Sequence, residues 1–314
     1  MAEQVKYLQS HYGTVPVQRS PQWYAARKGK ITASSVATLL YRDDKTCDSY
    51  IKTYGLESTF KKDSTASANP FQHREETIQE KAGGKSKSVG NVATYWGQKY
   101  EPVATTLYEY RQGTRVIDFG LIPHRTISFL GASPDGITPD GRMLEIKCPY
   151  RRKITGIPPF YYWIQVQIQM EVCDLDTCDF LECEFVEFGT LDEFIEASRS
   201  ADTAVGLFIQ IDTIPMDPAT RTYIYPPAHV SSGSLDDLLE WEWQTKKNRQ
   251  QQLHHPPHPH PRDEGEIVRT VFWKLVTYSC VRIDRDREWF EGILPDLEEA
   301  VTDIEKCRQR YTFS

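Results

Sequence analysis

The segment from Gly131 to Tyr150, GASPDGITPDGRMLEIKCPY, constrains the fold more than any other part of the sequence. A Pro-Asp-Gly turn lies at its centre, and the run after that turn alternates apolar and charged residues. Residues two apart on a β-strand project from the same face, so Glu145 and Lys147 point together. The segment therefore predicts a β-hairpin whose second strand is half-buried and carries a charged edge.

The same hairpin brings two carboxylates together. Asp135 ends the preceding strand, and folding the chain at the Pro-Asp-Gly turn returns its side chain towards Glu145. Converging carboxylate oxygens favour Mg²⁺ or Mn²⁺ over zinc. Lys147 beside them is suited to orient, or help deprotonate, a metal-activated water that attacks a phosphate. From this fragment alone, a solvated hairpin with a surface ion pair worth under about 1 kcal/mol is the simpler explanation.

The order of the predicted elements indicates an α/β protein. In chain order, these elements are helices at 32–40 and 91–112, strand-like runs at 115–124, 126–133 and 142–149, a helix at 158–173 and a strand at 178–188. We therefore predict a core built from helix, three antiparallel strands, helix and strand, with a mixed sheet.

The remaining chain is expected to elaborate one domain that spans residues 1–314. Its core covers about residues 15–190 and a C-terminal strand and helix at 265–312, in which 266–286 forms a long strand or a hairpin. Residues 191–262 form a peripheral elaboration with one helix at 234–252. The segment 253–264 is rich in His and Pro, and we expect a mobile loop without a fixed metal site, because the prolines prevent regular structure.

Composition narrows the function classes. A net charge of −7 argues against a wholly basic nucleic-acid coat, although cations cluster locally around Arg27 and from Lys147 to Lys153. Seven cysteines, an odd number, do not indicate a disulfide framework. There is no apolar run long enough to span a bilayer and no signal-peptide layout at the N-terminus, so we expect a soluble, intracellular protein without a membrane partner.

Four blocks of the sequence together resemble a known family. They are WYAARKGKITASSVATLL, WGQKYEPVATTLYEY, GASPDGI with LEIKCPY, and YYWIQVQIQMEV, in this order between about Trp23 and Phe185. The series resembles the lambda-exonuclease family, also called YqaJ-type viral recombinases, within the PD-(D/E)XK nuclease superfamily. The resemblance implies a restriction-endonuclease-like α/β core, with a central mixed sheet flanked by helices, in a single nuclease domain.

The resemblance also implies roles for individual residues. The metal-binding groups would be Asp135, Glu145, the carbonyl of Ile146, and Glu101, which holds a second ion or a water. The catalytic lysine would be Lys147, supported by Gln165. The substrate-binding residues would be Arg27, which receives a terminal 5′-phosphate, Ser34 and Ser133 near the same anion, and Tyr162, which shares a helix face with Gln165. Gln167 and Gln169 are expected to be ordinary polar surface, and Trp23 to lie in the core.

By this resemblance the chain would be a Mg²⁺-dependent exonuclease, with Mn²⁺ able to substitute. It would degrade one strand of duplex DNA from a 5′-phosphorylated end and leave 3′ single-stranded tails for recombination and repair. The expected protein partner is a single-strand annealing protein, and the chain is expected to form a homo-oligomer. The compartment would be the cytoplasm or, for a virus of a eukaryote, the host cytoplasm or nucleus. The alternatives are an endonuclease or structure-specific nuclease with the same core, and a non-catalytic DNA-binding scaffold.

Overall fold

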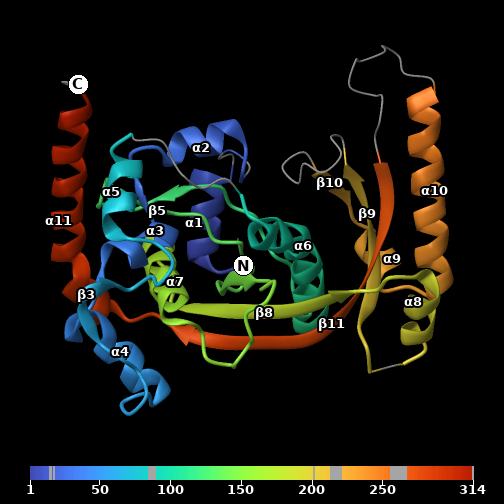
Figure 1. Ribbon diagram of the computed structural model, residues 1–314, viewed down its shortest axis with the longest axis horizontal. Helices are drawn as coiled ribbons and strands as arrows, with labels where there is room; N and C mark the ends of the chain where they lie inside the picture. The colour runs from blue at the N-terminus through green and yellow to red at the C-terminus, as the bar shows by residue number, and fades with distance from the viewer. Residues whose placement is uncertain are drawn as a thin grey trace.

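A six-stranded mixed sheet lies at the centre of the fold. The computed structural model describes residues 1–13, 16, 18–83, 90–200, 202–212, 221–254 and 267–312. The strand order in the sheet is β10 (Arg221–Ile224), β9 (Val205–Asp212), β11 (Ile267–Asp284), β8 (Thr177–Glu187), β7 (Met143–Lys147) and β6 (Gly136–Ile137). β7 and β8 are parallel and the other pairs are antiparallel. The predicted α/β class with a mixed, helix-flanked sheet is confirmed (Figure 1).

The prediction of three consecutive antiparallel strands is wrong, because the strand-like runs divide between two sheets. β4 (Ile122–Pro123) and β5 (Leu130–Ala132) join β1 (Ile31–Thr32) in a separate small sheet, whereas β6 and β7 belong to the large one. Pro134 lies two residues after the end of β5 and has no N–H to donate to a ladder, so the strand does not continue past it and the chain crosses to the large sheet. A further short pair joins β2 (Tyr41–Arg42) to β3 (Asp63–Ser67).

Two helices cover the two faces of β7. α7 (Phe160–Cys173) packs in one apolar cluster with Met143, and α6 (Val92–Gln112) packs in another with Leu144 and Ile146. This alternation is the one that the sequence predicts. The prediction of a half-buried, charged edge is wrong, because β7 lies between β6 and β8 and its Glu145 is only 1% exposed.

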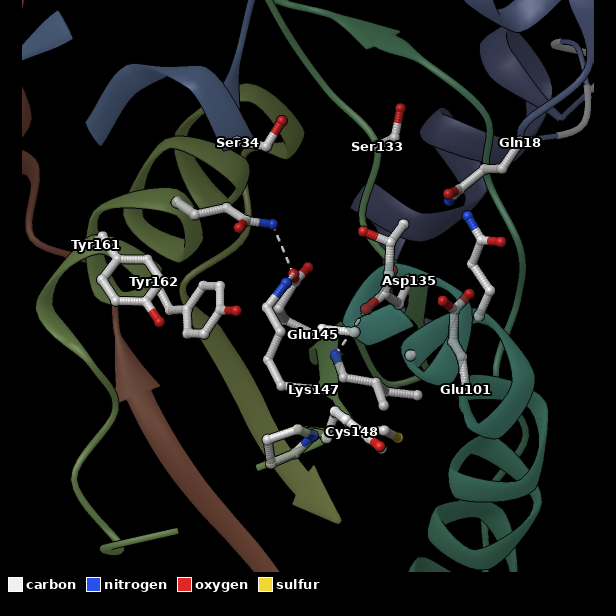
Figure 2. A pocket seen from close by; sticks show the side chains of 18 of the residues that line it. Gln18, Ser34, Glu101, Ser133, Asp135, Glu145, Lys147, Cys148, Tyr161 and Tyr162 are labelled. Atoms are coloured by element: carbon white, nitrogen blue, oxygen red, sulfur yellow. Dashed lines mark hydrogen bonds and ion pairs between the residues drawn. The ribbon is translucent and has the colours of Figure 1, made fainter. Parts of the chain in front are cut away.

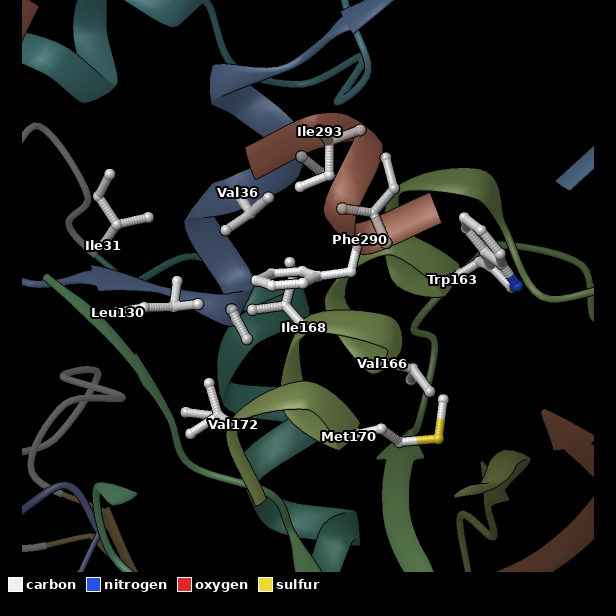
Figure 3. Packing of buried hydrophobic residues seen from close by; sticks show 14 of the residues in the cluster. Ile31, Val36, Leu130, Trp163, Val166, Ile168, Met170, Val172, Phe290 and Ile293 are labelled. Atoms are coloured by element: carbon white, nitrogen blue, oxygen red, sulfur yellow. The ribbon is translucent and has the colours of Figure 1, made fainter. Parts of the chain in front are cut away.

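The larger apolar cluster surrounds α7 with the N-terminal helices and the C-terminal helix. These helices are α1 (Glu3–Tyr12), α3 (Ala33–Leu39), α4 (Asp44–Tyr54), α5 (Arg74–Lys81) and α11 (Arg287–Thr312). α2 (Pro21–Arg27), which buries Trp23, lies outside this cluster. Figure 3 shows Val36 of α3, Phe290 and Ile293 of α11 and Ile168 of α7 meeting in this core. α3 confirms the helix predicted at 32–40. It begins with a capping box between Thr32 and Ser35.

A peripheral region, which includes the outer strands of the same sheet, lies at one end of the long strands β8 and β11. It contains α8 (Leu191–Ser198), β9, β10, α9 (Ala228–Ser231) and α10 (Leu235–His254), with Phe194, Leu207 and Leu238 in a cluster of its own (Figure 1). α10 confirms the predicted helix at 234–252, and the strand or hairpin predicted at 266–286 is one strand, β11. The predicted His/Pro loop at 253–264 lies outside the described residues from 255 onwards. All seven cysteines are free thiols.

Candidate active site

One open cleft gathers the predicted site residues. It has a volume of about 600 Å³ and lies where the ends of α2, α3, α6, α7 and the β6–β7 hairpin meet. The predicted residues that line it are Arg27, Ser34, Glu101, Ser133, Asp135, Glu145, Ile146, Lys147, Tyr162 and Gln165. Figure 2 shows Asp135, Glu145 and Glu101 pointing into the same space, with Ser34 and Ser133 on one side of them.

The hairpin positions Asp135 as predicted. Its turn is closed by the Thr138 N–H, which donates to the Arg142 carbonyl at 2.8 Å, and by Gly141 at φ +96°, a conformation that glycine adopts without strain. The Ile146 N–H on the returning strand donates to Asp135 Oδ2 at 2.7 Å. This bond ties the Asp135 carboxylate to the strand that carries Glu145.

Glu145 is held by more donors than the sequence predicts. Lys147 forms an ion pair with its Oε1, and Gln165 Nε2 donates to the same oxygen at 2.6 Å. Gln169 Nε2 donates to Oε2 at 2.8 Å. Gln165 and Gln169 are four residues apart on α7 and so lie on the helix face that covers β7.

The expectation that Gln167 and Gln169 are ordinary polar surface is wrong. Each is 1% exposed. Gln167 Nε2 donates to the Asp284 carbonyl at 2.9 Å, and its Oε1 accepts from the Asp286 N–H at 2.8 Å, which joins α7 to the end of β11. Both amides are buried because most of α7 lies inside the protein, so these polar side chains find partners there.

Two further residues, which the sequence did not indicate, lie beside the carboxylates of the cleft. Arg19 forms an ion pair with Glu101, and Gln18 Nε2 donates to the Pro134 carbonyl at 2.8 Å, next to Asp135. Arg19 has φ +67°, a left-handed conformation that costs a non-glycine residue free energy and often occurs at functional sites. No local pattern signals this pair, because Arg19 and Glu101 are far apart in the sequence.

The close approach of buried charged groups shifts the pKa values of Asp135 and Lys147. Burial, followed by the neighbouring charges of Glu145 and Glu101, raises the pKa of Asp135 well above its usual range. For Lys147, burial alone would lower the pKa, but the nearby Glu145 carboxylate and its neighbours outweigh it and raise the pKa above the usual range. Lys147 therefore remains cationic. Its charge does not offset the burial of Asp135 and the repulsion from Glu145 and Glu101, so Asp135 is harder to ionise than a free aspartate.

The donor set fits a divalent cation. Among the residues that the structure describes, no three His, Cys, Asp or Glu side chains are already gathered as a metal cluster. The carboxylates that face the cleft are instead engaged by Lys147, Gln165, Gln169 and Arg19. Oxygen donors from Asp135, Glu145 and the Ile146 main chain are the ligands that Mg²⁺ and Mn²⁺ prefer.

A second group of residues in the same cleft gathers around Arg27. Arg27, Ser34 and Ser133 carry donors that suit an anion, and we call them the anion pocket. Arg27 Nη2 donates to Ser34 Oγ at 3.3 Å and to Thr32 Oγ1 at 3.2 Å. Its guanidinium lies 4.1 Å from the ring centroid of Trp23, whose Nε1 donates to Ser133 Oγ at 3.0 Å. Burial lowers the pKa of Arg27 from its ordinary value. Trp23 is buried, as predicted, and it also connects Arg27 with Ser133.

Residues 22–176 match the family described as the YqaJ-like viral recombinase domain. The chain carries a YqaJ-like viral recombinase domain. This domain begins in α2 and ends just before β8, so it includes both the anion pocket and the carboxylate hairpin. Arg19 and β11 lie outside the matched residues.

Viral proteins are among the relatives of the YqaJ-like domain. An uncharacterized protein of Acanthamoeba polyphaga mimivirus is 26% identical over 317 residues, covering 90% of this chain and 51% of that protein. A protein of African swine fever virus is 26% identical over 183 residues, covering 48% of this chain and 45% of the relative. The chain thus spans about half the length of the curated relatives it matches.

Exonucleases are among the solved structures with which this chain aligns. An alkaline exonuclease from Laribacter hongkongensis, LHK-Exo, aligns with a TM-score of 0.45 and 22% identity over 93% of this chain and 98% of that one. A phage-related exonuclease from Haemophilus somnus aligns with a TM-score of 0.40 and 15% identity over 90% and 95% of the two chains. Over the described ranges, the helices of the YqaJ-like protein are too short or too polar to span a bilayer.

A cationic and aromatic wall completes the cleft of the YqaJ-like domain. Lys147 Nζ lies 4.4 Å from the ring centroid of Tyr162, and the guanidinium carbon of Arg152 lies 5.7 Å from the same centroid. Arg152 also forms an ion pair with the buried Glu182 of β8. Arg151 lines the cleft as well, whereas Lys153 does not. Only part of the basic cluster seen in the sequence therefore faces the site.

Proposed function

We propose that this protein is a Mg²⁺-dependent 5′-to-3′ exonuclease that acts on double-stranded DNA. Mn²⁺ is expected to substitute. The observation that carries the proposal is the placing of the Asp135–Glu145–Lys147 hairpin in the same cleft as the Arg27–Ser34–Ser133 anion pocket. The hairpin supplies groups for phosphodiester hydrolysis, and the pocket supplies groups that bind a terminal 5′-phosphate. The product would be a duplex with a 3′ single-stranded tail for recombination and repair.

Each residue has a specific task in this proposal. Asp135, Glu145, the Ile146 carbonyl and Glu101 would hold the cation, which when bound would lower the pKa of water and neutralise charge on the phosphate. Lys147 stays protonated beside Glu145, so it donates hydrogen bonds that orient the attacking water and stabilise developing negative charge. Gln165 and Gln169 fix the direction of the Glu145 carboxylate. Tyr162 packs against Lys147 and limits where its ammonium can go.

The expected partners follow from the same chemistry. The substrate is a duplex end with a 5′-phosphate, and the 3′ tail would pass to a single-strand annealing protein. We propose that residues 1–314 act as one nuclease domain, with the core of about 15–190 and 265–312 extended by a layer at 191–262, in an intracellular homo-oligomer. The longer viral relatives contain further sequence, so this proposal concerns the activity of the present chain.

Digestion of defined DNA tests the proposal. Linear duplex with one labelled 5′-phosphorylated end should release mononucleotides in Mg²⁺, whereas a closed circle should survive. Lys147→Ala should stop hydrolysis and leave DNA binding intact. Arg27→Ala should slow digestion of 5′-phosphorylated ends more than that of 5′-hydroxyl ends.

The same experiment separates the alternatives. Cutting of the closed circle would identify an endonuclease or structure-specific nuclease. Absence of nucleotide release at every Mg²⁺ and Mn²⁺ concentration, with DNA binding retained, would identify a non-catalytic scaffold.

A further inference from the structure

One large apolar side chain in the cleft is unusually exposed. Phe71, in the loop between β3 and α5, is 76% exposed and yet lines the cleft together with Arg27 and Ser34. An exposed aromatic ring at the mouth of a polar cleft gains nothing from burial in the free protein. Such a ring is available for a flat, partly apolar ligand.

The loop holds this ring in a fixed place. The Phe71 N–H donates to Asn69 Oδ1 at 2.9 Å, and the Asn69 N–H donates to the Ala37 carbonyl at 2.9 Å. Ser67 Oγ donates to the Thr38 carbonyl at 3.0 Å. The loop is thereby attached to α3, the helix that carries Ser34, so the ring and the anion pocket share one rigid support.

A second aromatic residue contacts the Phe71 ring. Tyr161 of α7 packs edge-to-face on Phe71, with ring centroids 5.5 Å apart and planes at 90°. Tyr161 in turn lies 4.2 Å from the ring centroid of Tyr162, which contacts Lys147. An edge-on contact leaves a face of Phe71 available, because only the margin of one ring meets the face of the other.

We propose that Phe71 stacks on the base of the 5′-terminal nucleotide whose phosphate occupies the Arg27–Ser34–Ser133 pocket. The inference rests on the proposed function and adds a base contact to it. A cleft of about 600 Å³ lies within the range that encloses small organic ligands, so it can take a nucleotide and the groups around it. Stacking on an aromatic ring suits every base, since all bases have a π-face, so this contact would position the terminal nucleotide without selecting its sequence.

The nearby cations favour a nucleic acid over an apolar peptide. Arg27, Arg151 and Arg152 line the cleft together with Phe71. Aromatic rings interleaved with phosphate-binding cations are the arrangement by which proteins hold unpaired strands. Because hydrogen bonds fix the loop backbone and Tyr161 contacts the ring, part of the ordering cost is met before the base arrives.

Binding of two matched duplexes tests the contact. Both carry the same 5′-phosphate, and one lacks the base of the terminal nucleotide. In the non-cleaving Lys147→Ala background, Phe71→Ala should weaken binding of the complete duplex about ten-fold, as expected for one lost stacking contact. It should leave binding of the abasic duplex unchanged, and Phe71→Trp should restore binding of the complete one. Tyr110→Ala is the matched control, since Tyr110 is also 76% exposed but lies outside the cleft lining.

The outcomes separate this inference from the function on which it rests. If Phe71→Ala weakens both duplexes equally, or weakens neither, the stacking contact is disproved even where the preference for 5′-phosphate persists. If the Lys147→Ala protein binds 5′-phosphorylated and 5′-hydroxyl ends equally, the anion pocket itself fails. Unchanged thermal melting of the Phe71 variants confirms that their effects come from the contact rather than from folding.

Discussion

At the scale of single residues, the chemistry centres on one buried carboxylate. Glu145 is 1% exposed and accepts from Lys147, Gln165 and Gln169. A buried carboxylate is tolerated only when its oxygens are hydrogen-bonded, so these donors satisfy the Glu145 oxygens and fix their orientation. A change in any one donor should therefore affect both folding and catalysis.

Replacement of Gln169 tests this dependence. Gln169→Leu removes the donor to Glu145 Oε2 and should lower the free energy of unfolding by about 1–3 kcal/mol, because a buried charged oxygen loses its partner. Nuclease activity should fall as well, since the carboxylate can rotate. Urea unfolding and nucleotide release measure the two effects. Gln244→Leu on the exposed face of α10 is the control and should change stability by less than about 0.5 kcal/mol.

Asp135 allows a prediction about pH and metal. Its pKa is raised in the folded protein by burial and by the charges of Glu145 and Glu101, so the folded state binds more protons than the unfolded state. Stability without metal should therefore fall as pH rises from about 4, the pKa of an unfolded aspartate, through the raised folded pKa.

Thermal melting in a chelator checks this sign. Asp135→Asn keeps an acceptor for the Ile146 N–H and removes the charge, so its melting temperature should exceed that of the wild type at neutral pH and approach it in acid. Added Mg²⁺ should stabilise the wild type and have little effect on the variant. A wild type that becomes more stable as pH rises, relative to Asp135→Asn, would contradict the argument.

At the scale of elements, close packing between strands decides where glycine is required. Gly206 of β9 pairs with Trp273 of β11, and a Cβ at Gly206 would lie 2.4 Å from Cζ2 of that ring. Trp273 is buried and packs edge-to-face on Phe185 of β8. The indole of Trp273 therefore fills the space beside Gly206 and packs β9 against β11 and β8 of the same sheet.

Gly206→Ala should destabilise the protein by about 1–3 kcal/mol, because the added methyl group forces a well-packed ring to move. Gly97→Ala on α6 is the matched control, since a Cβ there meets nothing within 4 Å. Alanine at a helical position should raise stability by about 0.4–1 kcal/mol. Denaturant unfolding of the two variants should give changes of opposite sign.

At the scale of the whole molecule, charge is divided between an acidic body and a locally basic cleft. The net charge is −7, yet Arg27, Arg151 and Arg152 all line the cleft. DNA binding should therefore depend on these local cations and weaken steeply with salt, since each phosphate contact releases counterions.

Arg151→Ala should reduce the slope of log binding constant against log salt by about one contact. Lys153→Ala should leave the slope unchanged, because Lys153 is exposed nearby but outside the cleft lining. Titration of a duplex end at several salt concentrations measures both slopes. Equal slopes for Arg151→Ala and the wild type would show that this arginine does not contact phosphate.

The sequence by itself determined the parts of this protein that depend on short-range geometry. The turn before Arg142, the approach of Asp135 to its returning strand and the common face of Glu145 and Lys147 follow from turn chemistry and strand periodicity. The helices at α3, α6 and α7 were predictable for the same reason. The resemblance of separate blocks supplied the grouping of Arg27 and Glu101 with this hairpin, which periodicity cannot provide.

The side chains that surround those groups depend on the tertiary structure. Gln169 looked like polar surface until α7 was seen enclosed, and the strand that looked like an edge lies inside the sheet. Arg19 and Phe71 reach the cleft from loops whose positions depend on contacts with distant elements. Burial and long-range pairing arise from the packing of the whole chain, so no local pattern encodes them.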